Sequence, residues 1–155
     1  MMLFPQEIWQ DVKGLGGLPL YIIISLLALL FGKMTLFVQL VIGLALAFGV
    51  TVILRFIYFR ERPDKKMSEP RNVIERIEAG SFPSLHAMRA AVLGTLLILL
   101  FHNLYASILV GAGVLGVAVA RVVLKRHFFW DVIFGVIIGI VIAFASVQVT
   151  TLLGY

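Results

Sequence analysis

Residues 128–153 read FFWDVIFGVIIGIVIAFASVQVTTLL, a long apolar run with a single charged side chain, Asp131. A helix needs about 20 mostly apolar residues to cross a hydrocarbon core about 30 Å thick, and this run is long enough. A backbone inside lipid must satisfy its own hydrogen bonds, so a run of this kind is expected to be a helix. The stretch therefore predicts an integral membrane protein.

Four further apolar runs precede this stretch. They are Leu15–Phe31, Thr35–Leu54, Ala87–Phe101 and Leu104–Ala120. The second of these is also long enough to span a bilayer, whereas the other three are shorter and must borrow flanking residues or pack inside the bundle. We therefore expect an all-α, multi-pass helical bundle with about five transmembrane helices, forming a single domain over residues 1–155.

The composition supports this class. The 155 residues are 61% hydrophobic and 14% charged, whereas a soluble domain carries about a quarter charged residues. The mean hydropathy is +1.07. The net charge of +5 is better explained by positive loops beside lipid headgroups than by nucleic acid, so membrane lipids are the expected partners. No cysteine is present, which excludes disulfides and thiolate metal sites.

The segments outside the runs are unequal. Residues 1–14 carry Phe4, Ile8, Trp9 and Val12 at helical spacing, which predicts an N-terminal interfacial helix. Very short connections follow the first and third runs. A long polar connection, Arg55–His86, follows the second run, and a shorter one, Arg121–His127, follows the fourth. Residues 72–79, within the longest connection, are expected to form a short amphipathic helix.

Threading the five runs through a membrane places the two polar connections at the same face. Of thirteen Lys and Arg residues, only Lys33 falls on the opposite face. The positive-inside rule then favours a cytoplasmic location for the polar face. Arginines retained for chemistry would produce the same bias, so the side of the membrane stays open.

Three polar motifs lie at the ends of apolar runs on this face. They are Arg55-x6-Arg62-Pro63, Pro83-Ser84-Leu85-His86 and Arg121-x5-His127-x3-Asp131. Together they supply three arginines, two histidines, a serine and a carboxylate. These groups are suited to binding a phosphate and breaking its ester or anhydride bond.

The third motif contains a candidate nucleophile. His127 and Asp131 are four residues apart and would share one face of a helix. An aspartate that accepts the Nδ1 proton fixes the histidine tautomer and leaves Nε2 free to attack. A purely structural pair is the alternative. Arg121 lies close enough in the chain to reach a phosphate held at His127.

The other two motifs supply candidates for phosphate binding and proton transfer. Ser84 is a good helix cap, and the amides that it would cap also form an anion site. His86 is a candidate general acid for a departing oxygen, with a structural role as the alternative. Arg55 and Arg62 can form bidentate bonds to phosphate oxygens, or they can simply flank the membrane. The sequence lacks an acidic cluster of the kind that binds metals, so we predict no metal and no cofactor.

At these positions the chain resembles the type 2 phosphatidic acid phosphatase superfamily, whose signature is K-x6-R-P, P-S-G-H and S-R-x5-H-x3-D. The resemblance covers about half of the chain. It implies that His127 forms a phosphohistidine intermediate, that Asp131 orients it, and that His86 protonates the leaving group. It also implies a set of groups that hold the phosphate oxygens, namely Arg55, Arg62, Ser84, the Leu85 amide and Arg121.

Three positions depart from that signature. Arg55 replaces a lysine, Leu85 replaces a glycine and Ala120 replaces a serine. The P-S-L-H form is also similar to the branch that contains inositol phosphorylceramide synthases, which transfer a phospho-headgroup to a lipid alcohol. The family usually has six spans, so the N-terminal helix here stands where a further span is expected.

The sequence thus predicts a membrane phosphatase acting on a lipid monophosphate or diphosphate, such as phosphatidic acid or a polyprenyl diphosphate. A lipid phosphotransferase is the first alternative. A small transporter or anion-binding protein is the second, and it would require charges along the spans, where the sequence has almost none.

Overall fold

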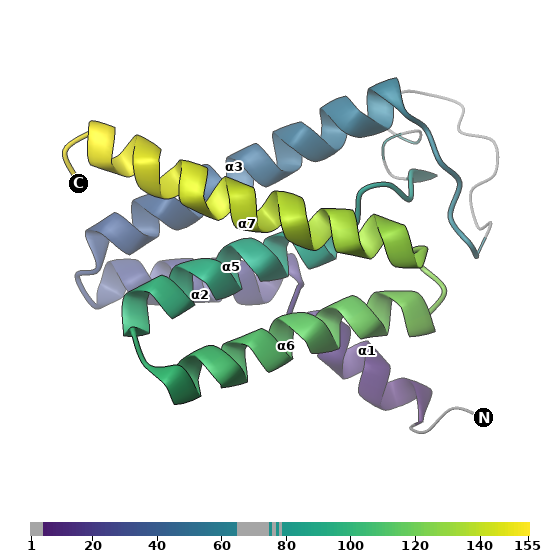
Figure 1. The fold of residues 1–155 in the computed structure, drawn as a ribbon, viewed down its shortest axis with the longest axis horizontal. Coiled ribbons are helices and arrows are strands. Elements are labelled where there is room, and N and C mark those ends of the chain that lie inside the picture. Colours follow the sequence, from purple (N-terminus) through teal and green to yellow (C-terminus); the bar gives the residue numbers. More distant parts are fainter. Residues whose placement is uncertain (1–4, 65–74, 76, 78) are drawn as a thin grey trace.

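The computed structural model describes residues 5–64, 75, 77 and 79–155, apart from the side chain of Gln6. Its helices are α1 (Gln6–Gly14), α2 (Leu18–Leu30), α3 (Met34–Ile57), α5 (Leu85–Phe101), α6 (Leu104–Val123) and α7 (Phe129–Leu152). Figure 1 shows them as one elongated bundle, with no strand in the part of the chain that is described. The all-α prediction is confirmed. The short helix predicted over residues 72–79 lies largely outside the described residues.

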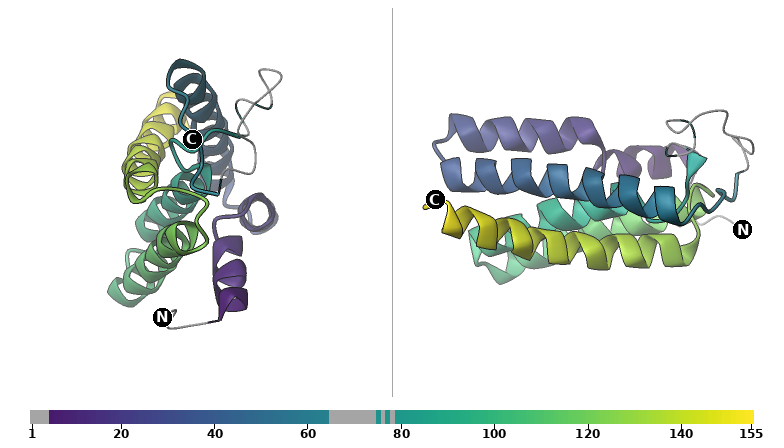
Figure 2. Two further views of the ribbon diagram at one scale, coloured as in Figure 1. Left: turned by 90° about the vertical axis from the view of Figure 1, so that its right-hand side faces the viewer. Right: turned by 90° about the horizontal axis from the view of Figure 1, so that it is seen from above.

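Helices α2, α3, α5, α6 and α7 correspond to the five predicted apolar runs. Four candidate spans are long and apolar enough to cross a membrane: α3, α6, α7 and the stretch Glu7–Leu30, which joins α1 to α2. At 17 residues, α5 is shorter. It lies inside the bundle and packs against α2, α3, α6 and α7 (Figure 2). The chain is therefore a multi-pass membrane protein.

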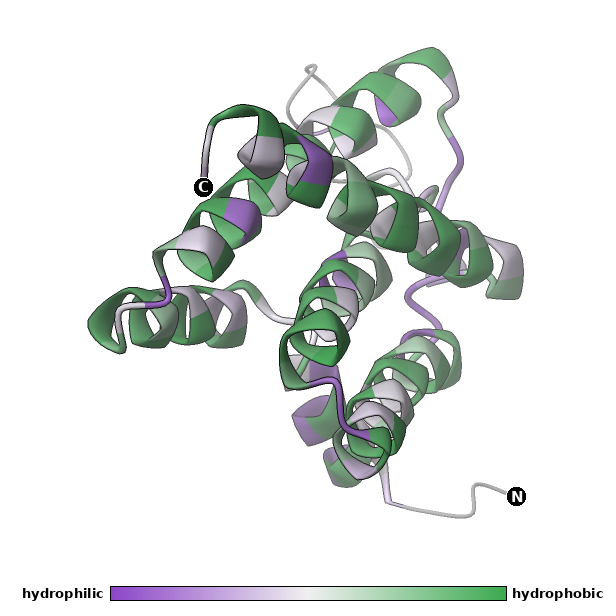
Figure 3. Ribbon diagram, turned by 60° about the vertical axis from the view of Figure 1, so that its left-hand side comes forward, coloured by the Kyte–Doolittle hydropathy of each residue, from purple (hydrophilic) through white to green (hydrophobic). Residues whose placement is uncertain are grey.

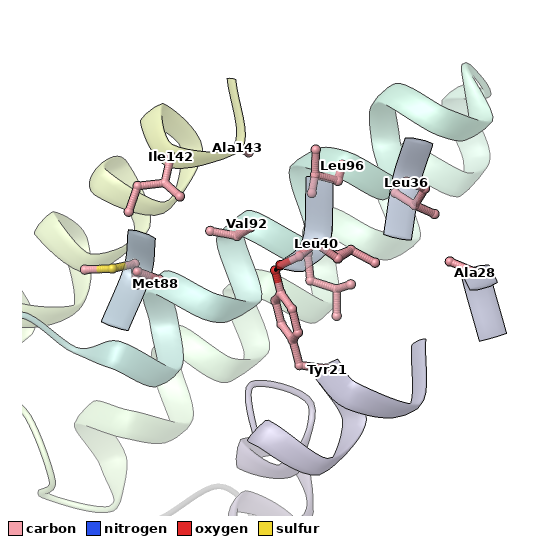
Figure 4. Packing of buried hydrophobic residues seen from close by; sticks show 11 residues of the cluster. Tyr21, Ala28, Leu36, Leu40, Met88, Val92, Leu96, Ile142 and Ala143 are labelled. Carbon is pink, nitrogen blue, oxygen red and sulfur yellow. Dashed lines mark hydrogen bonds between the residues drawn. The ribbon is translucent and has the colours of Figure 1, made fainter. Parts of the chain in front are cut away.

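The core lies where α2, α3, α5 and α7 meet. Tyr21, Leu40, Met88, Val92 and Leu96 are buried there (Figure 4). The Tyr21 hydroxyl donates to the Leu40 carbonyl at 2.9 Å, so its polar atom is satisfied inside the apolar core.

The outside of the bundle is also apolar. Leu30, Leu109 and Leu115 are 77%, 75% and 65% exposed, and Figure 3 shows predominantly hydrophobic helices. An apolar surface around an apolar core is the arrangement expected of a bundle surrounded by lipid.

Glycines allow α5 and α7 to approach closely. A Cβ at Gly139 would overlap the Met88 carbonyl oxygen, and one at Gly135 would lie 2.7 Å from the Ser84 carbonyl oxygen. Their spacing on one helix predicts such packing. Gly111 and Gly113 of α6 do not serve such packing, because a Cβ at either position would meet nothing within 4 Å.

The N-terminal helix α1 forms as predicted and packs on α6 (Figure 2). Its Val12 lies 3.3 Å from the position that a Cβ would take at Gly116. The location of α1 at a membrane interface stays a prediction. Its last turn brings Lys13 to the end of the bundle where the three motifs lie.

Candidate active site

The three motifs meet at one end of the bundle (Figure 1), as the threading of the spans predicts. Arg55 lies in the last turn of α3 and Arg121 in the last turn of α6. Ser84 is the N-cap of α5, His86 lies in its first turn, and Asp131 lies in the first turn of α7. A cavity of about 800 Å³ opens between them. Six of the eight predicted site residues line it: Arg55, Arg62, Leu85, His86, Arg121 and His127. Ser84 and Asp131 are fully buried and do not line it.

The candidate nucleophile His127 is 2% exposed, and its Nδ1 lies 2.7 Å from the Ser81 carbonyl oxygen. The prediction that Asp131 accepts the Nδ1 proton is therefore wrong. The i, i+4 argument requires both residues on one helix, but α7 begins only at Phe129, after an extended Phe128. A carbonyl oxygen can only accept, so Nδ1 carries the proton and Nε2 keeps its lone pair.

The surroundings of His127 keep its ring neutral. Burial, followed by the nearby Arg121 charge, lowers the pKa of His127 to about 2, although the Ser81 hydrogen bond opposes the shift. Arg62 and Arg55 add smaller contributions that also lower the pKa. A neutral imidazole is the form that attacks phosphorus, so the residue is suited to nucleophilic catalysis at ordinary pH.

Asp131 supports the histidine indirectly. It accepts hydrogen bonds from the Ser81 hydroxyl, from Arg60 Nη1 at 2.9 Å and from the Phe128 amide at 2.9 Å. The last of these caps α7. Because Ser81 also presents its carbonyl to His127, the carboxylate fixes the residue that orients this candidate nucleophile.

Sequence reasoning missed both side-chain partners of this carboxylate. Arg60 lies inside the variable part of the first motif, where it reads as a membrane flank. Its guanidinium lies 4.1 Å from the centroid of the Phe128 ring and forms an ion pair with Asp131. Ser81 belongs to none of the three motifs, and the local sequence contains no signal for its role.

Two of the predicted phosphate-binding arginines also bind the backbone. Arg55 donates to the Ile77 carbonyl at 2.7 Å and to the Pro83 carbonyl at 3.0 Å. Arg62 Nε donates to the Gly80 carbonyl at 3.3 Å. A Cβ at Gly80 would lie 2.9 Å from Arg55 Cδ, so a larger residue here would push the Arg55 side chain from its present position. The two arginines thus shape the loop before α5 as well as lining the cavity.

Several buried donors around the cavity have no partner among the described residues. They are Arg55 Nε, Arg121 Nε and Ser84 Oγ. Ser84 occupies the N-cap position of α5, yet its hydroxyl caps no amide, so the capping role expected from sequence is wrong. Buried polar atoms are normally paired, and an anion at this helix N-terminus would accept from such donors.

The cavity also has lining residues that the motifs did not indicate. Lys13 and Arg126 add positive charge, while Phe48, Thr51 and Val52 of α3 form a mostly apolar wall. Arg126 pairs with Asp64 at 2.7 Å. A site with cations on one side and apolar groups on the other fits a ligand with a phosphate head and a hydrophobic tail.

The residues that the structure describes contain no group of three or more His, Asp or Glu side chains placed to hold a metal. The prediction that the site works without metal or cofactor remains a prediction. The positive charge available for a phosphate comes from the arginines, from Lys13 and from the N-terminus of α5.

Two solved structures share this fold. The crystal structure of Aquifex aeolicus LpxE superposes with a TM-score of 0.75 at 20% identity, covering 92% of this chain and 85% of that one. That of the transmembrane PAP2-type phosphatidylglycerolphosphate phosphatase from Bacillus subtilis gives 0.65 at 22% identity, covering 94% and 76%. No curated protein matches by sequence. The sequence profile of the PAP2 superfamily matches residues 36–154, a range that includes all three motifs, and the chain therefore belongs to the PAP2 superfamily.

Proposed function

We propose that this protein is a membrane phosphatase that removes the terminal phosphate of a lipid monophosphate or diphosphate through a phosphohistidine at His127. One observation carries the proposal. A buried, neutral histidine, with Nδ1 held by a carbonyl, lines a cavity that three predicted phosphate-binding arginines also line. This combination leaves Nε2 as the nucleophilic nitrogen.

The proposed reaction has two steps. Nε2 of His127 attacks phosphorus, the bond from phosphorus to the lipid oxygen breaks, and His86 gives that oxygen a proton. In the second step water attacks phosphorus and gives a proton back to His86. The P–N bond then breaks, inorganic phosphate leaves and the His127 imidazole is restored. Arg55, Arg121 and Ser84 supply the buried unpaired donors that would bind the phosphate oxygens as charge develops on them.

The membrane location supports a lipid as the substrate. The cavity opens at the end of an apolar bundle and has an apolar wall on α3. The Bacillus subtilis relative is described as a phosphatidylglycerolphosphate phosphatase, and its similarity in fold is consistent with a lipid phosphate here. Phosphatidic acid and a polyprenyl diphosphate are the two types of substrate to test first.

A matched pair of histidine variants tests the proposal. His127→Asn should abolish phosphate release by the detergent-solubilised protein, because no other group replaces Nε2. His102→Asn is the control, since His102 is exposed in the connection between α5 and α6 and adopts a left-handed conformation that asparagine tolerates. Full activity in a folded His127→Asn protein would refute the mechanism.

A phosphotransferase uses the same first step with a different acceptor. Leu85 lines both the phosphate cavity and an adjoining apolar groove, which gives a lipid alcohol a route to the site. Adding an alcohol acceptor and measuring transferred headgroup distinguishes the two functions. Release of free phosphate alone, at every acceptor concentration, contradicts transfer.

The non-catalytic alternative is less well supported. Each charged residue within α3, α5, α6 and α7 (Arg55, Arg89, Arg121 and Asp131) lies near the end that carries the motifs, and α2 has none. A transport path through the bundle would require polar groups along its length.

A further inference from the structure

A second cavity adjoins the phosphate cavity. It has a volume of about 450 Å³ and opens between α2, α3 and α5. Phe48 and Leu85 line both cavities, so the two are neighbours across these side chains. The residues that line the second cavity are Leu18, Ser25, Val41, Leu44, Ala45, Phe48, Leu85 and Arg89. Arg89 is the one charged residue in this set.

Arg89 is buried, and no opposite charge pairs with it among the residues that the structure describes. It is 8% exposed, and its Nε has no hydrogen-bond partner among the described residues. None of the side chains that line the groove with it is acidic, and the ion pairs found in the described part of the chain do not include it. A buried, unpaired cation inside a membrane protein is costly and usually serves a function.

Arg89 also lies close to the catalytic groups. It follows His86 by three residues on α5, so the two side chains share one helical face. Side chains on a helix lean toward its N-terminus, which directs the long arginine side chain back toward His86 and the phosphate cavity. Arg89 lines the apolar groove, which adjoins the catalytic cavity at Phe48 and Leu85.

We propose that Arg89 binds a second phosphate of the substrate, and hence that the substrate is a lipid diphosphate whose hydrocarbon chain occupies the groove. This proposal rests on the function proposed above. His127 Nε2 bonds to the terminal phosphorus, the bridging P–O bond breaks, and its electron pair stays on the departing lipid monophosphate. His86 supplies the proton, and Arg89 pairs with the non-bridging oxygens of that departing phosphate.

Charge favours a phosphate over an ester carbonyl as the partner of Arg89. A neutral carbonyl can accept a hydrogen bond, but it leaves the buried positive charge uncompensated. A phosphate supplies the missing negative charge and matches the two-pronged geometry of a guanidinium. The phosphate attached to the lipid chain is also the group that would lie between the attacked phosphorus and the apolar groove.

The test compares two substrates with the same tail, farnesyl diphosphate and farnesyl monophosphate. We expect the unaltered protein to have the higher kcat/KM for the diphosphate. Arg89→Met should lower that value roughly 10- to 100-fold, the range expected for loss of a charge-assisted hydrogen bond. It should leave the monophosphate value close to that of the unaltered protein. Arg89→Lys, which keeps the charge, should recover part of the loss.

A charge control and the contrary outcomes complete the design. Lys33→Met removes one exposed positive charge at the far end of the bundle and should change neither value. Equal losses on both substrates in Arg89→Met, or a preference of the unaltered protein for the monophosphate, overturn the role of Arg89 but keep the phosphatase. Hydrolysis of neither substrate overturns the phosphatase itself.

Inhibition of the unaltered protein gives an independent measurement if Arg89→Met does not fold. The probes are farnesyl phosphonates in which CH₂ replaces the hydrolysable oxygen. A two-phosphorus analogue should bind more tightly than its one-phosphorus counterpart, and Arg89→Lys should weaken only the former. Equal inhibition by the two analogues contradicts a second phosphate subsite.

Discussion

Asp131→Asn is the substitution that most directly tests the geometry around the nucleophile. The carboxylate is fully buried and accepts three hydrogen bonds, from Ser81, Arg60 and the Phe128 amide. Asparagine has the same shape, but it lacks the charge and replaces one acceptor oxygen by an NH₂ donor. If its oxygen keeps Ser81 and Phe128, the NH₂ faces the Arg60 guanidinium, donor against donor.

The cost in stability follows from this loss. Removing one partner of a buried ion pair costs about 3–5 kcal/mol. Because the Arg60 side chain is 34% exposed and can turn toward water, we expect about 3 kcal/mol, the lower end of that range. The midpoint of thermal unfolding in detergent should therefore fall, and phosphate release must be measured well below that midpoint.

The effect on catalysis separates two arrangements. Where an aspartate holds the catalytic histidine directly, its replacement by asparagine lowers kcat by about 10⁴-fold. Here the Ser81 carbonyl holds Nδ1, so Asp131→Asn keeps the correct tautomer and only loosens Ser81. We expect kcat to fall by roughly 10- to 100-fold, in line with the loss of one or two hydrogen bonds.

Steady-state phosphate release by the folded variant provides the assay, with Ser81→Ala as the companion variant. Ser81→Ala keeps the carbonyl that orients His127 but removes the hydroxyl that contacts Asp131. The two variants should therefore show losses of similar size. A loss near 10⁴-fold in Asp131→Asn, together with a small loss in Ser81→Ala, would refute the indirect arrangement.

Three further outcomes test other parts of the structure. The folded-state pKa of His127, about 2, lies below its unfolded value of 6.5, so unfolding takes up a proton as the pH falls. This group alone should lower the stability by about 2 kcal/mol between pH 7 and pH 5, and His127→Gln, followed by thermal unfolding, should reduce the total drop by that amount. Gly139→Ala should destabilise by about 1–3 kcal/mol because its Cβ overlaps the Met88 carbonyl, whereas Gly113→Ala, in open space, should not; equal midpoints of thermal unfolding would contradict the packing. Lys13→Met should raise KM for lipid phosphates more than it lowers kcat, since Lys13 lines the cavity from a helix outside the three motifs; an unchanged KM would exclude it from substrate binding.

Much of the fold could be predicted because hydropathy determines which segments of this chain form the helices of the bundle. Uninterrupted apolar runs must be helices in lipid, and the alternation of short and long connections places the motifs at one end. The exceptions have local causes. Gly111 and Gly113 lie away from any helix contact, because the arrangement of neighbouring helices decides which glycines are used for close packing.

The sequence predicted most of the residues that gather at the site, but not the hydrogen bonds and ion pairs that they form. Charges are scarce in this chain, so a motif rich in them identifies the residues that gather around the cavity. The partners of those residues depend on where each helix starts. Because α7 begins at Phe129, two residues after His127, the histidine lies outside the helix and does not share a helical face with Asp131. The Asp131 carboxylate pairs with Arg60 instead, and the Ser81 carbonyl accepts the hydrogen bond from His127.

That carbonyl belongs to the short segment 80–84, which links all three motifs. The Gly80 carbonyl accepts a hydrogen bond from Arg62, and the Pro83 carbonyl accepts one from Arg55, both residues of the first motif. The Ser81 carbonyl accepts a hydrogen bond from His127, in the third motif. The Ser81 amide donates to the Arg60 carbonyl at 2.7 Å, and the Ser84 amide donates to the Asp131 carbonyl at 2.9 Å.

Because backbone atoms make these bonds, side-chain identity alone could not reveal them. His127, the two arginines of the first motif and the start of α5 are therefore all positioned by this one segment. A change in the backbone path of residues 80–84 would displace all of them together. Substitutions that alter this path should therefore affect the proposed reaction even where the substituted side chain does not line the cavity.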